Sequence, residues 1–155
     1  MNKQYVMDNF SLEGRKAIVT GAAQGMGRSI AEALHDAGAI VALVDYSASV
    51  KETARQMDET GKSVLPFQAD LSKREEIDRV FSEVMQAFDG HIDILVNNAG
   101  ITRRHKPEEF PREDWDAVIN VNMNAVWFLS QLAGQIMLKQ GYGKIINMAS
   151  MNCYF

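Results

Sequence analysis

The sequence predicts an α/β fold in which a parallel sheet is covered by helices on both faces. Short apolar, β-branched segments alternate along the chain with segments whose apolar residues recur at helical spacing. The short segments are continuously apolar, which is typical of strands buried on both faces of a parallel sheet. Because crossovers between parallel strands are right-handed, we expect a doubly wound arrangement of about five strands.

The first half of the chain contains three predicted strands separated by two helices. The strands are expected at Lys16–Thr20, Ile40–Val44 and Ser63–Phe67. After the first strand, apolar residues recur at i, i+4, i+8 and i+11 from Met26, and Gly38 is placed to end this helix. The apolar face of the second helix consists of Val50, Ala54 and Met57.

The second half continues the alternation. The segment Ser72–Glu75 (SKRE) has the pattern of a capping box, so we expect a helix to begin there and to end at Gly90. A fourth strand is predicted at Ile92–Val96 and a fifth at Lys144–Met148, with a long helix from about residue 112 to about residue 139 between them. A sheet of six or seven strands would need more chain.

Length and composition indicate one globular domain over residues 1–155. The chain is 46% hydrophobic and 23% charged, and its net charge of -4 gives no electrostatic reason to bind nucleic acid or an anionic membrane. The single cysteine, Cys153, excludes an internal disulfide and a cysteine metal cluster. No secretory signal or membrane-spanning segment is visible, so we expect a cytoplasmic protein.

The first strand leads into a glycine-rich turn, Thr20–Gly27 (TGAAQGMG). Glycines allow a tight turn and a close approach of the backbone to a pyrophosphate, and the following helix N-terminus offers free N–H groups to the phosphates. A glycine cluster can also serve a simple turn, but its place between a strand and a helix in the first βαβ unit favours a Rossmann-type dinucleotide site.

Two aspartates follow the second and third strands. Asp45 lies about 20 residues beyond the glycines, where a carboxylate can accept both ribose hydroxyls of NAD and would repel the 2′-phosphate of NADP. Asp70 occupies the corresponding place after the third strand. Either residue could instead serve only as a turn or helix-start residue.

The TGxxxGxG spacing at Thr20–Gly27, together with Asn97-Asn98-Ala99-Gly100 after the fourth strand, resembles the short-chain dehydrogenase/reductase family from about Leu12 to the end of the chain. The resemblance implies an NAD cofactor and a role for Asn97 in tying neighbouring strands together. The cofactor-binding residues that it implies are Gly21, Gln24, Gly25, Met26, Gly27, Asp45, Asp70, Leu71, Asn98, Ala99 and Gly100.

The same resemblance implies two catalytic residues. Asn122, with Asn120 and Asn124 as nearby alternatives, matches an asparagine that holds a water of the proton relay. Ser150 matches a serine that orients the substrate and can donate to its carbonyl oxygen. The family's Tyr-x-x-x-Lys pair is absent: Tyr154 is too close to the serine and no lysine follows it. We therefore expect the 155 residues alone to be inactive, as a fragment or as a natural truncation.

Within the family, the segment from Asn97 to Arg104 is most similar to sugar-acid dehydrogenases of the gluconate 5-dehydrogenase type. Arg103 and Arg104 could bind a substrate carboxylate, although loop arginines are often only solvated. The resemblance implies hydride transfer between NAD(H) and a secondary alcohol or ketone, in a homo-oligomer, a tetramer built through the long helix. The alternatives are a non-catalytic NAD-binding fragment or partner subunit, and a methyltransferase, against which the Asn97–Gly100 motif argues.

Overall fold

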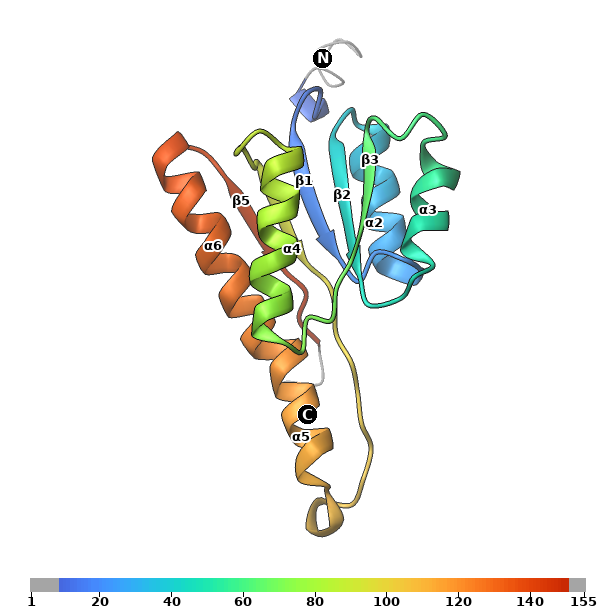
Figure 1. The fold of residues 1–155 in the computed structure, drawn as a ribbon, viewed down its shortest axis with the longest axis vertical. Coiled ribbons are helices and arrows are strands. Elements are labelled where there is room, and N and C mark those ends of the chain that lie inside the picture. The colour runs from blue at the N-terminus through green and yellow to red at the C-terminus, as the bar shows by residue number, and fades with distance from the viewer. Residues whose placement is uncertain (1–8, 151–155) are drawn as a thin grey trace.

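The computed structural model describes residues 9–150, and its centre is a five-stranded parallel sheet in the order β3-β2-β1-β4-β5 (Figure 1). The Rossmann-type, doubly wound fold predicted from the sequence is confirmed. The strands are β1 Lys16–Thr20, β2 Ile40–Asp45, β3 Val64–Gln68, β4 Ile94–Asn97 and β5 Lys144–Asn147. The edge strand β3 contains Pro66, a residue that lacks an N–H and that sheets accept at their edges.

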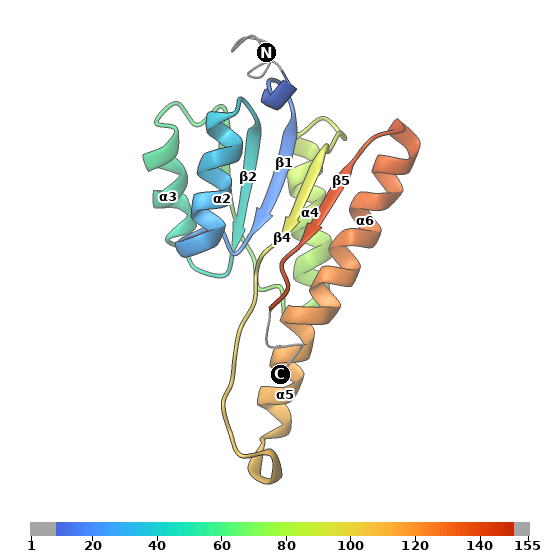
Figure 2. The same cartoon turned by 180° about the vertical axis from the view of Figure 1, so that it is seen from behind.

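Helices α2 (Gly25–Asp36) and α3 (Val50–Met57) lie on one face of the sheet, and α4 (Arg74–Ala87) and α6 (Ala125–Gln140) lie on the other (Figure 2). Successive strand residues point to opposite faces, so β1 contributes to two cores. Ile18 packs in the α4 and α6 core, whereas Ala17 and Val19 pack in the α2 and α3 core.

The long helix expected near residues 112–139 is present, with an irregular turn within it. It consists of α5 (Arg112–Ile119), a π-helical turn at Asn120–Asn124 and α6, and a short 3-10 turn at Pro107–Glu109 precedes it. Backbone angles at the junctions stay helical, so the three parts form one continuous helix. Its α5 end extends beyond the sheet in both views (Figures 1 and 2). No helix in residues 9–150 is long and apolar enough to cross a membrane.

The capping box predicted at Ser72 is wrong. Helix α4 begins at Arg74, and its N-cap residue is Lys73, whose side chain makes no capping hydrogen bond. The Ser72 hydroxyl instead donates to Asp70 Oδ1 over 2.6 Å. The serine therefore belongs to the turn after β3, one residue before the N-cap position of the helix.

Candidate functional site

A cleft of about 660 Å³ lies at the carboxyl ends of the central strands. It is at the point where the strand order reverses, because β1 pairs with β2 on one side and with β4 on the other. All the cofactor-binding residues expected from the sequence line it: Gly21, Gln24, Gly25, Met26, Gly27, Asp45, Asp70, Leu71, Asn98, Ala99 and Gly100.

The cleft lining also includes residues that the sequence did not point to. Tyr46, Ala69 and Ser72 directly flank predicted residues, and their adjacency could have revealed them. Ala117 and Val121 come from the long helix, more than 15 residues beyond the Asn97–Gly100 motif. No local pattern signals such a contact, because it depends on how the helix is placed against the sheet.

The glycines of the Thr20–Gly27 turn serve three different steric needs. Gly21 has φ +66° and would bring an added Cβ within 2.9 Å of the Ala99 Cα. A Cβ on Gly27 would overlap the Gly21 carbonyl oxygen, so this position requires a residue without a side chain. Gly25 has φ +57° and would direct a Cβ into open space in the cleft, where the phosphate of a ligand can approach the protein backbone.

Thr20 joins the glycine turn to the segment after β4. Its Oγ1 accepts hydrogen bonds of 3.0 Å from the backbone N–H groups of Asn98 and Ala99, and it donates to the Val96 carbonyl oxygen. In return, Asn98 Nδ2 donates to the Thr20 carbonyl oxygen over 2.9 Å. These reciprocal bonds fix two cleft-lining loops that are more than 70 residues apart in the sequence.

The Asp45 carboxylate faces the cleft with part of its bonding capacity still available. Oδ2 accepts from the Ala23 N–H over 3.0 Å, and Oδ1 accepts from the Ser47 N–H over 2.8 Å. An ionised carboxylate has about four acceptor positions, so about two remain for a ligand diol. The next residues, 46–49 (YSAS), offer no cation for a 2′-phosphate.

Asp70 lines the cleft and also organises its own turn. Its Oδ1 accepts from the Ser72 hydroxyl and, over 3.0 Å, from the Ser72 N–H, while Oδ2 lies 3.5 Å from Lys73 Nζ. Partial burial raises the pKa of Asp70, but the bonds from Ser72 and Lys73 together lower it below its ordinary value. The carboxylate is thus ionised, and the turn interpretation and the cleft interpretation apply to the same residue.

Two asparagines connect the cleft wall to the rest of the fold. Asn97 Nδ2 donates to Asn147 Oδ1 over 2.9 Å, which confirms that Asn97 ties β4 to β5. Asn122 makes a pair of 2.9 Å bonds with the backbone of Ile101, accepting from its N–H and donating to its carbonyl oxygen. Asn124 instead donates to Asn120, so Asn122 is the member of this trio that bonds to a cleft-lining residue.

The remaining predicted residues lie apart from one another. Arg103 lines the cleft, and its Nε donates to Asp114 Oδ1 over 3.3 Å. Arg104 is exposed and is not among the residues that line the cleft, and the exposed Ser150 is not among them either. His105 Nε2 lies 2.7 Å from Asp114 Oδ2. Cys153 and Tyr154 lie outside the described residues.

The sequence profile of the short chain dehydrogenase family matches residues 15–155. The chain belongs to this family.

Two curated members of the family are similar to nearly the whole of this chain. A 2-dehydro-3-deoxy-D-gluconate 5-dehydrogenase of Bacillus subtilis strain 168 is 46% identical over 147 residues, which is 95% of this chain and 57% of the relative. An NAD-dependent glycerol dehydrogenase of Listeria innocua is 37% identical, over 92% of this chain and 55% of the relative. The chain thus spans little more than half the length of these curated relatives.

A solved structure extends the similarity to three dimensions. The crystal structure of a Beutenbergia cavernae protein, assigned as an NAD(P)-dependent gluconate 5-dehydrogenase, holds NADP at low occupancy. It matches 94% of this chain and 58% of its own with a TM-score of 0.86 and 40% sequence identity. Named relatives thus include one that depends on NAD and one that holds NADP.

Proposed function

We propose that this protein is an NAD-dependent oxidoreductase that transfers a hydride between NAD(H) and a secondary alcohol or ketone on a sugar acid. One observation carries the proposal: the glycine turn, Asp45 and the Asn98–Gly100 segment line a single cleft at the switch point of the sheet. The family and the names of several relatives support an oxidoreductase over a methyltransferase.

The cleft residues fit a dinucleotide. The first turn of α2, Gly25 to Gly27, lines the cleft, and Gln24 makes no side-chain cap bond to its N–H groups. These N–H groups and the helix dipole favour a pyrophosphate. Asp45 would accept from the adenosine ribose hydroxyls, and Asp70 and Leu71 would lie beside the adenine. When bound, the nicotinamide would accept or supply the hydride.

NAD is proposed over NADP because of charge at Asp45. A 2′-phosphate beside this carboxylate would meet a like charge. Arg103, the cation in the described lining, donates to Thr102 in the loop that follows the Asn98–Gly100 segment and to Asp114 on α5. The NADP found in the Beutenbergia relative makes this preference a matter for direct measurement.

Two residues are proposed to act on the substrate side. The Ser150 hydroxyl would donate to the substrate oxygen as negative charge develops on it. Asn122 would serve the proton relay by holding a water. The two bonds to Ile101 use one acceptor position and one N–H of the Asn122 side chain, so the side chain positions the cleft wall and keeps one of each for a water.

A sugar acid is proposed as the substrate because a guanidinium lies in the cleft wall. Arg103 retains N–H groups beyond those given to Asp114 and Thr102, and such groups suit bidentate binding of a carboxylate. Arg104, in the same loop, is a second candidate for binding this carboxylate.

The function is tested on the protein expressed from its complete natural gene. Calorimetry would measure the affinity for NAD, and NADH absorbance would measure turnover of sugar acids against matched neutral polyols. We expect NAD binding and turnover of the acids. NAD binding without turnover of any alcohol or ketone would favour the alternative, a nucleotide-binding partner subunit. Preferential binding of S-adenosylmethionine would instead indicate a methyltransferase.

We further propose that the protein is a homo-oligomer, a tetramer, joined through its long helix. Trp115, Trp127 and Leu138 are 58%, 64% and 85% exposed on α5 and α6. Large apolar side chains gathered on one helix are typical of a buried interface. Light scattering at micromolar concentration should give a multiple of the monomer mass, and a monomer would contradict the proposal.

A further inference from the structure

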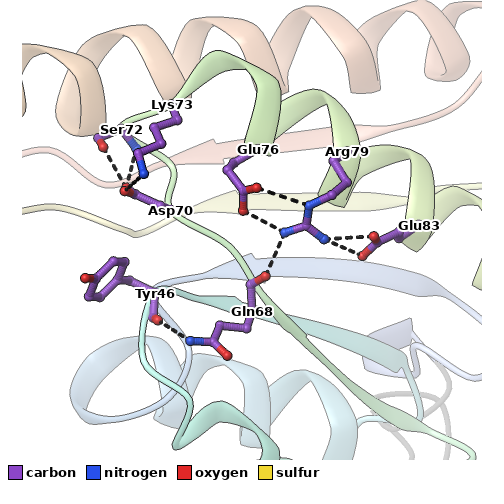
Figure 3. A network of polar contacts seen from close by, with 8 residues as sticks. All are labelled: Tyr46, Gln68, Asp70, Ser72, Lys73, Glu76, Arg79 and Glu83. Atoms are coloured by element: carbon purple, nitrogen blue, oxygen red, sulfur yellow. Dashed lines mark hydrogen bonds and ion pairs between the residues drawn. The ribbon is translucent and has the colours of Figure 1, made fainter.

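Gln68, the last residue of β3, connects the two strand ends that frame one end of the cleft. Its side-chain Nε2 donates to the carbonyl oxygen of Tyr46 over 3.0 Å (Figure 3). Tyr46 directly follows Asp45, and Ala69 and Asp70 directly follow Gln68, and all four of these neighbours line the cleft. The position of Gln68 therefore affects both sides of this end of the cleft.

Arg79, on α4, binds the backbone of the same residue. Its Nη2 donates to the Gln68 carbonyl oxygen over 3.0 Å. Glu76 and Glu83, one turn before and one turn after it on the helix, bind the rest of the guanidinium: Nη2 lies 2.7 Å from Glu76, and Nη1 lies 2.8 Å from both carboxylate oxygens of Glu83 (Figure 3). The guanidinium is thus held in one orientation.

This network differs from an ordinary surface ion pair. An isolated exposed pair contributes little, because solvent screens it and its side chains must be ordered. Here the guanidinium also binds a backbone carbonyl, and that carbonyl belongs to an edge strand with no further strand beside it in residues 9–150. The Arg79 guanidinium and, to a smaller extent, the Asp70 N–H lower the pKa of Glu76, so Glu76 stays ionised next to the cleft turn.

We propose that Arg79, which lies outside the cleft, is a positioning residue for the adenosine end of the nucleotide site. It fixes the end of β3 through Gln68, and Gln68 fixes the peptide of Tyr46 beside Asp45. The exposed Tyr46 ring and the Asp70 turn are thereby held at the separation that the bound adenosine requires. This inference rests on the nucleotide-binding function proposed above.

Half-cofactors separate this role from general stability. Calorimetry on the protein expressed from its complete natural gene would measure Kd for AMP and for nicotinamide mononucleotide in wild type, Arg79→Ala, Gln68→Ala and the double variant. We expect each single variant to raise Kd for AMP about threefold to tenfold, the effect of about one hydrogen bond. Kd for nicotinamide mononucleotide should stay unchanged.

The double variant tests the route. Gln68→Ala removes the bond to Tyr46 but keeps the backbone carbonyl that Arg79 binds, so the two substitutions act on one connection. We therefore expect the two effects not to add: Kd for AMP in the double variant should not exceed the higher of the two single-variant values. The matched control is Arg55→Ala on α3, which removes another exposed arginine held by a carboxylate, Glu52, and should leave both affinities unchanged.

Three results would overturn the inference. One is an AMP affinity within twofold of wild type in both single variants, with NAD still bound by the wild type. Another is a parallel loss of AMP and nicotinamide mononucleotide binding, which would show a general loss of structure. A wild-type protein that binds neither AMP nor NAD would overturn the proposed function together with this inference.

Discussion

Two aspartates at opposite ends of the same sheet bind their surroundings in different ways. Asp93 lies directly before β4, with its side chain only 2% exposed, and accepts from Arg15 Nη1 over 2.8 Å and from the Lys16 N–H over 2.9 Å. His91 Nε2 lies 3.2 Å from its second oxygen. Asp45 ends β2, is only partly buried, and accepts from two backbone N–H groups at the edge of the cleft.

The difference shows which end of the sheet is closed and which is open. At the amino end, the Arg15 and His91 side chains and the Lys16 N–H occupy the acceptor positions of Asp93, and the Arg15 guanidinium lies 4.5 Å from the centre of the Tyr142 ring. Burial raises the pKa of Asp93, but the bonds from Lys16, Arg15 and His91 lower it below its ordinary value. At the carboxyl end, Asp45 keeps acceptor positions for a ligand. The first carboxylate stabilises the fold, and the second is available for binding.

The largest effect is expected from Asp93→Ala. The substitution leaves the Lys16 N–H and Arg15 without their carboxylate acceptor; because the Arg15 side chain is 44% exposed and stays solvated, we expect a loss of about 2–4 kcal/mol in the free energy of unfolding, the worth of two hydrogen bonds to a buried carboxylate. Urea denaturation would measure this loss, while the affinity of the folded protein for NAD should not change. A loss below about 1 kcal/mol, the value for an exposed pair, would remove the distinction between the two ends.

Asp45→Ala should weaken NAD binding and change the free energy of unfolding little. Losing the charged acceptor for the ribose hydroxyls should weaken NAD binding by about 1.5–3 kcal/mol, roughly tenfold to a hundredfold, and relax the preference against NADP. The free energy of unfolding should change far less than in Asp93→Ala, because water can replace the carboxylate at a partly exposed position. Kd values for NAD and NADP test this, and a wild-type preference for NADP would contradict it.

Acid should remove the stabilisation that Asp93 gives to the amino end of the sheet. Because the pKa of Asp93 is lower in the folded protein than its ordinary 3.8, the unfolded chain binds the proton first. The stabilisation by this carboxylate is therefore complete above pH 3.8 and is lost as the pH falls below that value toward its folded pKa. The stability difference between wild type and Asp93→Asn should shrink over that interval. A constant difference between pH 6 and pH 3 would show that the ionised form is not what stabilises the fold.

The smallest effect is expected from Asp89→Asn, at the same amino end as Asp93. Asp89 lies 3.4 Å from Lys16 Nζ, but its side chain is 92% exposed. Its φ of +53° is one that asparagine adopts as readily as aspartate. We expect a change within about 0.5 kcal/mol in the free energy of unfolding. A larger loss would mean that location at this end, and not burial, determines the contribution of a carboxylate.

The sequence by itself determined the strands, the helices between them and most of the candidate cleft. Strand β1 was predicted at its observed bounds, and β4 begins two residues later than expected. These elements follow from local periodicity, and the glycine turn follows from steric needs of neighbouring residues. Asp45 and Asn98 could be placed in the cleft because parallel strands bring their carboxyl ends to one edge of the sheet.

Only the tertiary structure decided which partners the polar side chains take. Ser72 binds Asp70 where the local pattern predicted a helix cap, and Arg103 rather than Arg104 reaches the cleft wall. Asp93 and Arg15 meet across 78 residues, and Gln68 reaches Tyr46 across 22. Hydrogen bonds and ion pairs depend on the distance and direction between two atoms. Residues far apart in the chain acquire that geometry only when the strands pair and the helices pack, so no periodic pattern in the sequence records it.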